Sequence, residues 1–146
     1  MIQAVGPGDA ALLADLHRQG FERPWSEGEI AKLLENAAVF AFLSTAEGRP
    51  QGFVMAWVVA DEAEILTVAV ASAARRKGVG AALVTAAGVA ALVRGAASMH
   101  LEVAEDNAAA RSLYRKLGYE ESGRRRGYYS GGDAILMRRI LPRPVL

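Results

Sequence analysis

The sequence predicts a single α+β domain with about seven strands and about four helices, on three observations. The chain has 146 residues, which suffices for one domain with a buried core and leaves no room for a second catalytic domain. Segments with alternating apolar residues are interleaved with segments of helical periodicity. At one junction a β-branched strand leads through Gly78 and Gly80 into a long apolar stretch.

The N-terminal half is expected to contain four strands and two helices. Alternation and turn signals predict strands at residues 3–5, 39–44, 52–59 and 64–70. Asp9 is placed to cap the first helix, whose apolar side is Leu12, Leu13 and Leu16. The second helix begins at Glu27, because Ser26 and Glu29 form a capping box and Trp25 stands at the hydrophobic-staple position.

The C-terminal half is expected to contain two helices and three strands. A helix over residues 80–93 ends before Gly95, and a strand follows at 98–104. Asn107 is placed to cap a helix that Gly118 closes. The last strands are predicted at residues 119–126 and 134–140, and residues 141–146 are expected to form a loose tail.

Composition excludes several function classes. The chain lacks cysteine, which excludes disulfides and thiolate chemistry, and two histidines make a metal cofactor unexpected. A net charge of +1 does not favour nucleic acid as a partner. The N-terminus does not resemble a signal peptide, so a cytoplasmic protein is expected. The longest near-apolar run, residues 79–93, is shorter than the roughly 20 residues that span a membrane.

The glycine-rich junction, residues 75–80, has the layout of a phosphate-binding cradle. Its two glycines allow close approach to the backbone, and the following helix directs unpaired N–H groups and its positive dipole end at an anion. A nucleotide-hydrolysing P-loop is excluded, because the sequence has no Gly-Lys pair. A dinucleotide site requires a third glycine or alanine where this chain has Leu83, although Glu102 stands where its ribose-binding acid would. That interpretation remains an alternative.

A third ligand class fits better. The acyl-CoA pyrophosphate site has Arg or Gln, two residues, Gly, one residue, then Gly or Ala, a pattern that Arg75, Gly78 and Gly80 meet. Four further motifs follow in order: Leu101-Glu102-Val103, Asn107-Ala108-Ala109-Ala110, Leu113-Tyr114 and Leu117-Gly118-Tyr119. On these motifs the chain resembles the GNAT superfamily of acetyltransferases over nearly its whole length. The resemblance implies one GNAT (acyl-CoA N-acyltransferase) domain over residues 1–146. Its expected architecture is a three-layer α/β arrangement that contains a mixed sheet.

The resemblance also implies how acetyl-CoA binds. In the family the third strand of the meander and the strand that holds Glu102 splay apart, which leaves backbone groups free to bond the pantetheine arm. The expected cofactor-binding residues are Val68, Ala69, Val70, Arg75, Arg76, Lys77, Gly78, Val79, Gly80, Ala81 and Asn107. Arg124, Arg125 and Arg126 have no comparable context and are expected to form a solvated turn or edge, with contact to an acidic partner as the alternative.

Catalytic residues follow from resemblance to the RimI branch of the superfamily, the ribosomal-protein alanine acetyltransferases. Glu102 is then the general base and Tyr114 the general acid, with His100 as a rival base on the same strand face. From periodicity alone, Glu102 would be the polar side of a strand and Tyr114 a core aromatic. Three aromatic residues are expected to contact the acceptor: Trp25, Tyr128 and Tyr129.

The expected reaction is direct transfer of an acetyl group to a primary amine. At pH 7.5 a lysine amine costs roughly 3 kcal/mol more to deprotonate than an α-amine, so a carboxylate base suits the α-amine. With the RimI resemblance this predicts a protein N-terminus as acceptor, such as the alanine of a small-subunit ribosomal protein. The alternatives are a small amine or lysine acceptor, a non-catalytic acyl-CoA-binding module and a dinucleotide oxidoreductase. Ser130 replaces a family proline, which leaves the acceptor open.

Overall fold

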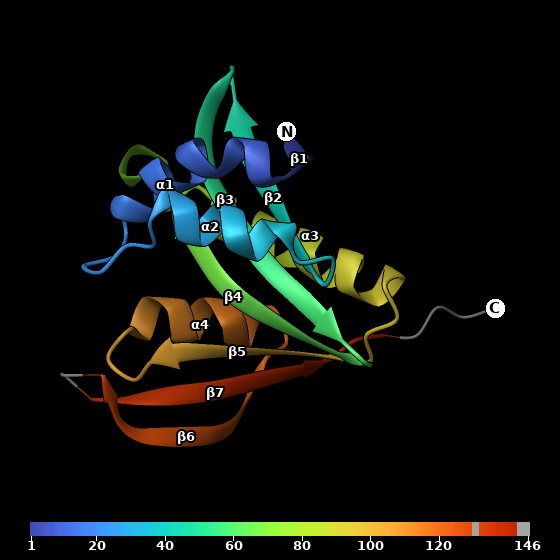
Figure 1. The fold of residues 1–146 in the computed structure, drawn as a ribbon. Helices are drawn as coiled ribbons and strands as arrows, with labels where there is room; N and C mark the ends of the chain where they lie inside the picture. The colour runs from blue at the N-terminus through green and yellow to red at the C-terminus, as the bar shows by residue number, and fades with distance from the viewer. Residues whose placement is uncertain (130–131, 143–146) are drawn as a thin grey trace.

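The structure is a computed structural model that describes residues 1–129 and 132–142. A seven-stranded sheet lies between two helical layers, as predicted (Figure 1). The strands are β1 (Ile2–Val5), β2 (Val39–Ala46), β3 (Arg49–Val59), β4 (Glu62–Val70), β5 (Ser98–Ala104), β6 (Glu120–Tyr129) and β7 (Gly132–Ile140). The helices are α1 (Ala10–Arg18), α2 (Glu27–Glu35), α3 (Val79–Val93) and α4 (Ala108–Lys116), with short 3₁₀ turns at Pro7–Asp9 and Ser72–Ala74.

Most local signals in the sequence act as predicted. Ser26 Oγ accepts a hydrogen bond from the Glu29 N–H at 3.1 Å, and the Glu29 carboxylate accepts one from the Ser26 N–H, so the capping box is confirmed. The Asn107 side chain caps α4 by accepting from the Ala110 N–H at 3.2 Å. Asp9 differs: it precedes α1, but its carboxylate accepts from the Gly6 N–H and caps the 3₁₀ turn instead.

Several boundaries differ from the prediction, and two of these differences have a clear physical reason. The β2–β3 turn consists of Glu47 and Gly48, both at positive φ (53° and 76°), so β3 begins at Arg49 and includes Pro50. This is the backbone of a two-residue hairpin, which glycine favours. Leu141 is not part of a loose tail: it is buried, and its N–H donates to the Ala97 carbonyl at 2.9 Å. The rest of the expected tail, from residue 143, lies outside the described residues.

The sheet opens between its two central strands. Its order is β1-β2-β3-β4-β5-β7-β6, and only the β4–β5 pair is parallel, which makes the sheet mixed. β4 and β5 are paired only at Glu62–Ser98, Ala63–Met99 and Glu64–His100. Beyond these pairs the two strands diverge, as Figure 1 shows. The ends of β4 and β5 therefore have backbone groups that face the opening rather than each other.

A bulge in β4 sets which side chains face which layer. Adjacent residues Met55 and Ala56 of β3 pair with Thr67 and Ile65, so Leu66 is an extra residue in β4. Since Met55 and Ala56 point to opposite faces, Ile65 and Thr67 do as well. Glu64 therefore shares a face with Thr67, whose hydroxyl contacts His17 of α1. The acidic start of β4 thus faces the α1–α2 layer.

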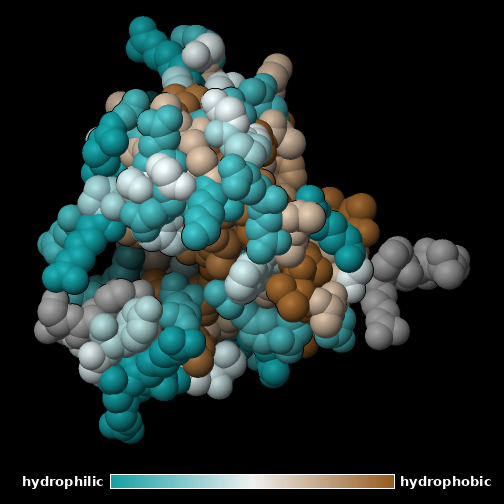
Figure 2. Space-filling model, in the orientation of Figure 1, coloured by the Kyte–Doolittle hydropathy of each residue, from teal (hydrophilic) through white to brown (hydrophobic). Residues whose placement is uncertain are grey.

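The core lies on both sides of the sheet. Leu13 and Ile30 of the α1–α2 layer are fully buried, as are Leu83 and Ala87 of α3. Hydrophilic side chains cover most of the face seen in Figure 2, which is hollowed on its left. Within the described residues, no helix combines the length and apolar character that crossing a membrane requires.

Candidate active site

A cavity of about 600 Å³ lies between the end of β4, the start of α3 and α4. Ten of the eleven residues expected to bind acetyl-CoA line it: Val68, Ala69, Val70, Arg75, Arg76, Gly78, Val79, Gly80, Ala81 and Asn107. Lys77 is the exception and is absent from the lining. Residues of a strand, a helix start and a second helix therefore meet at one cavity, which we call the cofactor cavity.

The start of α3 has the features of an anion site. Gly78 precedes the helix at φ 79° and offers no side-chain cap, so the first N–H groups of α3, at Val79, Gly80 and Ala81, have no partner within the helix. A Cβ at Gly80 would lie 3.7 Å from Leu113 and Val70. These residues fit a phosphate group, because the donors are free and the cavity beside them is kept open by glycine.

The segment after α1 also reaches this cavity, which the sequence analysis missed. Gly20 and Phe21 line it. The guanidinium of Arg75 donates to the Gln19 carbonyl at 2.6 Å, and the Gln19 side chain accepts from the Ser72 N–H at 3.0 Å. Arg75 therefore anchors the α1–α2 segment to the cradle as well as lining the cavity. No sequence signal at Gln19 announces this contact, because it joins residues more than 50 positions apart.

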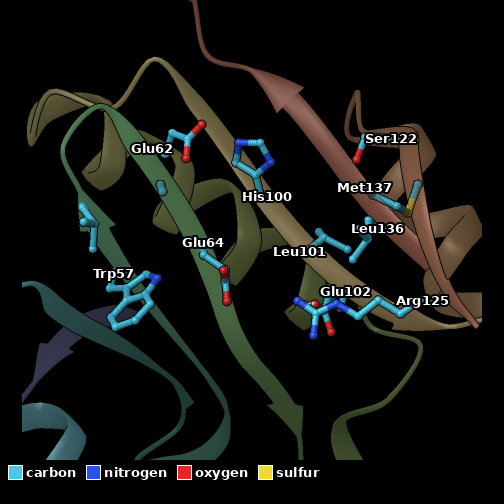
Figure 3. A pocket seen from close by; sticks show the side chains of 12 residues that line it. Trp57, Glu62, Glu64, His100, Leu101, Glu102, Ser122, Arg125, Leu136 and Met137 are labelled. Carbon is cyan, nitrogen blue, oxygen red and sulfur yellow. Dashed lines mark ion pairs between the residues drawn. The ribbon is translucent and has the colours of Figure 1, made fainter. Parts of the chain in front are cut away.

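A second cavity, of about 450 Å³, lies on the α1–α2 face where β4 and β5 begin to separate (Figure 3). His100 and Glu102 line it together, as their shared strand face predicts. Trp57, Glu64 and Arg125 join them from β3, β4 and β6. We call it the acceptor cavity. The acceptor cavity is thus lined by the start of β4 and by β5, and the cofactor cavity by the end of β4, so both lie along the strands that diverge.

Glu102 is held by an arginine that the sequence analysis placed in solvent. Arg125 Nη2 lies 3.0 Å from Glu102 Oε1, and the same guanidinium lies 5.5 Å from the ring centre of Tyr128. Arg124 is paired as well, with Glu105 and with Asp133, and its hydrogen bond lowers the pKa of Asp133. Arg124 and Arg125 therefore lie exposed on the edge strand β6, as expected, and each also pairs with a carboxylate.

The other ionisable groups of the acceptor cavity differ in their surroundings. The His100 Nε2 atom is engaged with the Ser98 hydroxyl at 3.0 Å. Partial burial raises the pKa of Glu64, and the negative charge of Glu102 raises it further, while His100 and Arg125 act in the opposite direction. Among the described residues, no group of three or more potential metal ligands is close enough to hold an ion.

Tyr114 lines neither cavity. It lies half-buried on the inward side of α4, next to Leu113 of the cofactor cavity, with its ring edge-on to Tyr119 at 5.9 Å. Burial raises the pKa of the Tyr114 hydroxyl, so it is protonated at neutral pH. Its role as general acid remains a prediction that requires the hydroxyl to reach the opening.

The three residues expected to bind the acceptor do not line the acceptor cavity as a group. The Trp25 N–H donates to His17 Nδ1 at 3.0 Å, and the Trp25 ring stacks on His17 at 4.9 Å. The Tyr128 ring contacts the guanidinium of Arg125, which lines the acceptor cavity. The side chain of Tyr129 lies outside the described residues. The aromatic side chain that lines this cavity is Trp57, which alternation alone marked only as part of a strand.

Comparisons with known proteins agree with this architecture. The model of the acetyltransferase (GNAT) family matches residues 10–119. The chain is 37% identical over 140 residues to a ribosomal protein bS18-alanine N-acetyltransferase of Escherichia coli strain K12, covering 93% of this chain and 94% of that protein.

Two solved structures are also similar. The ribosomal-protein-S18-alanine N-acetyltransferase from Escherichia coli superposes with a TM-score of 0.91 at 31% identity, covering 99% of this chain and 96% of that one. NAA60 of Arabidopsis thaliana in complex with acetyl-CoA has the same fold, with a TM-score of 0.83 at 19% identity over 97% of this chain and 98% of that one.

Proposed function

The chain belongs to the GNAT family of acetyltransferases, and we propose that it transfers the acetyl group of acetyl-CoA to the α-amino group of an N-terminal alanine on a ribosomal protein. The observation that carries the proposal is the pair of cavities at the β4–β5 opening. One side presents free helix N–H groups and arginines, which suit a pyrophosphate, and the other presents Glu102. A thioester in the opening would lie within reach of both.

In the proposed reaction, both substrates bind before transfer. The cysteine-free chain offers no thiol to carry an acyl group. Glu102, directly or through a water molecule, accepts a proton from the acceptor ammonium. The neutral amine nitrogen then forms a bond to the thioester carbonyl carbon as the carbon–sulfur bond breaks. The second proton that this nitrogen loses on becoming an amide passes through water to the tyrosine oxygen that has protonated the thiolate.

Two further groups complete the mechanism. A backbone N–H near Val68 to Val70, freed by the divergence of β4 and β5, donates to the carbonyl oxygen as negative charge develops on it. Tyr114, which is protonated at neutral pH, donates its proton to the departing CoA thiolate. The products are an acetylated amine and CoA.

The acceptor is argued from charge and from similarity. An α-amine has a pKa near 7.7–8.0, whereas the pKa of a lysine amine is near 10.4. A carboxylate base therefore deprotonates an α-amine at a far lower free-energy cost than a lysine amine. The name of the Escherichia coli relative describes an N-acetyltransferase for the alanine of a ribosomal protein, and the two chains align over nearly their full lengths. Both considerations favour an N-terminal alanine.

A turnover panel tests the proposal. Acetyl-CoA consumption is measured with an alanine-starting peptide that contains no lysine, a lysine peptide with a blocked N-terminus, and a polyamine. We expect acetylation of the first substrate, with the acetyl group located on the α-amine by mass spectrometry. Preferential turnover of the lysine peptide or the polyamine would assign a different acceptor class. CoA binding without any turnover would indicate a non-catalytic acyl-CoA-binding module.

A further inference from the structure

We propose that Glu64 determines acceptor specificity by forming, with Trp57, a subsite for a cationic side chain of arginine or lysine at the second or third residue of the acceptor. The inference deepens the proposed function and rests on it only in taking the acceptor cavity as the peptide site. It concerns a residue to which neither the sequence analysis nor the proposed mechanism gives a role.

The register of three strands places Glu64 between an aromatic and the catalytic strand. Trp57 pairs with Glu64 across β3 and β4, and Glu64 pairs with His100 across β4 and β5. The three side chains form one row on the same face and line the acceptor cavity. In Figure 3, Glu64 lies between Trp57 on one side and the Glu102–Arg125 pair on the other.

Charges in this cavity are only partly neutralised. Arg125 lies 3.0 Å from Glu102 and supplies its counter-charge. Among the residues that the structure describes, Glu64 has neither an ion pair nor a hydrogen bond from a side chain. Partial desolvation and the charge of Glu102 raise its pKa, so ionised Glu64 lacks stabilisation that a ligand cation would provide. The cavity therefore favours a ligand that brings a positive charge.

The acceptor amine is a poor candidate for that cation. It has to lose its proton before it attacks the thioester, so its charge disappears as the reaction proceeds. An arginine or lysine side chain keeps its charge at neutral pH. The face of Trp57 adds an attraction for the same group, of about 0.5–2 kcal/mol for cation–π contacts in general. The 450 Å³ cavity also exceeds what the methyl group of alanine requires.

The test compares peptides that differ in one charge. Alanine-starting peptides carry arginine, its neutral isostere citrulline or glutamate at position 2 or 3, and calorimetry measures their binding in the presence of CoA. We expect the wild type to bind one arginine peptide roughly tenfold more tightly than its citrulline counterpart. Glu64→Gln should remove this preference without weakening citrulline-peptide binding. Glu64→Arg should favour the glutamate peptide. Glu35→Gln, an exposed carboxylate of α2 that lines neither cavity, is the matched control.

The outcomes separate this inference from the proposed function. Equal affinity of the wild type for arginine and citrulline peptides, or no binding of any peptide, overturns the subsite, and neither result depends on how a variant folds. An arginine preference that survives in Glu64→Gln overturns the role of Glu64. Charge-selective binding without acetylation would reject the proposed function and leave the subsite standing. Acetylation without any charge preference would support the proposed function and reject the subsite.

Discussion

Two neighbouring tyrosines have hydroxyl groups in different surroundings, which affects whether each group can act on a ligand. Tyr114 and Tyr119 lie edge to edge, and burial raises the pKa of both, that of Tyr119 to about 12. The Tyr119 hydroxyl is buried and has no hydrogen-bond partner among the described residues, whereas Tyr114 is half-buried beside the cofactor cavity. Of these two tyrosines, Tyr114 is therefore the candidate for giving a proton to a ligand.

Exchanging each tyrosine for phenylalanine tests this difference. Tyr114→Phe should lower kcat by about 100-fold and leave CoA affinity unchanged, because it removes only a proton donor. Tyr119→Phe should leave kcat within about twofold and raise the free energy of unfolding by about 1 kcal/mol, since it removes an unsatisfied buried hydroxyl. Steady-state kinetics and urea unfolding measure both. Equal kcat values for the two variants would make Tyr114 a core aromatic.

At the scale of elements, the start of α3 and the bulge of β4 create the site. The cradle was visible in the sequence, because two glycines between a strand and a helix form a local pattern. The bulge was not, since the consecutive apolar residues Ile65 and Leu66 are also typical of a strand that is buried on both faces. Arg125 was missed for a related reason: it meets Glu102 only because β6 pairs with β7 and β7 with β5. Local patterns predicted the elements, and pairing between distant segments decided the contacts.

Gly80→Val tests the cradle at the second position of α3. The new Cβ meets only ordinary contacts at 3.7 Å, so folding should be preserved, but the two methyl groups would occupy the cavity beside the free N–H groups. We expect CoA affinity, measured by calorimetry, to fall roughly tenfold or more. Gly28→Val is the matched control, because Gly28 holds the same position in α2 and lines neither cavity. Unchanged CoA affinity in a folded Gly80→Val protein would remove α3 from the phosphate site.

At the scale of the whole molecule, His17 joins the α1–α2 layer to the strand that opens. It is 1% exposed, stacks on Phe21 at 4.0 Å and accepts a hydrogen bond from the Trp25 N–H at Nδ1. Its Nε2 therefore carries the proton and donates to the Thr67 hydroxyl on β4 at 3.2 Å. Phe21 lines the cofactor cavity, so this neutral histidine holds part of the site in place.

Stability should consequently depend on pH through His17. Burial lowers its pKa below the ordinary value of 6.5, so under mildly acidic conditions the unfolded chain binds a proton that the folded one does not. The free energy of unfolding should then fall as pH drops below 6.5, with a slope of up to about 1.4 kcal/mol per pH unit from this group. Urea unfolding between pH 5 and 7.5 measures the slope, with His17→Gln expected to be flatter and His100→Gln as control. Equal slopes in wild type and His17→Gln would show that His17 does not make stability depend on pH.

The role of Glu102 as general base predicts how kcat with an alanine-starting peptide depends on pH. Glu102→Gln keeps the side-chain shape and should lower kcat on the order of 100-fold at pH 7. The loss should shrink as pH rises past roughly 8, because the α-amine then loses its proton without help, and His100→Ala should stay close to wild type. Near-wild-type activity of Glu102→Gln at pH 7, or a large loss confined to His100→Ala, would show that Glu102 is not the base.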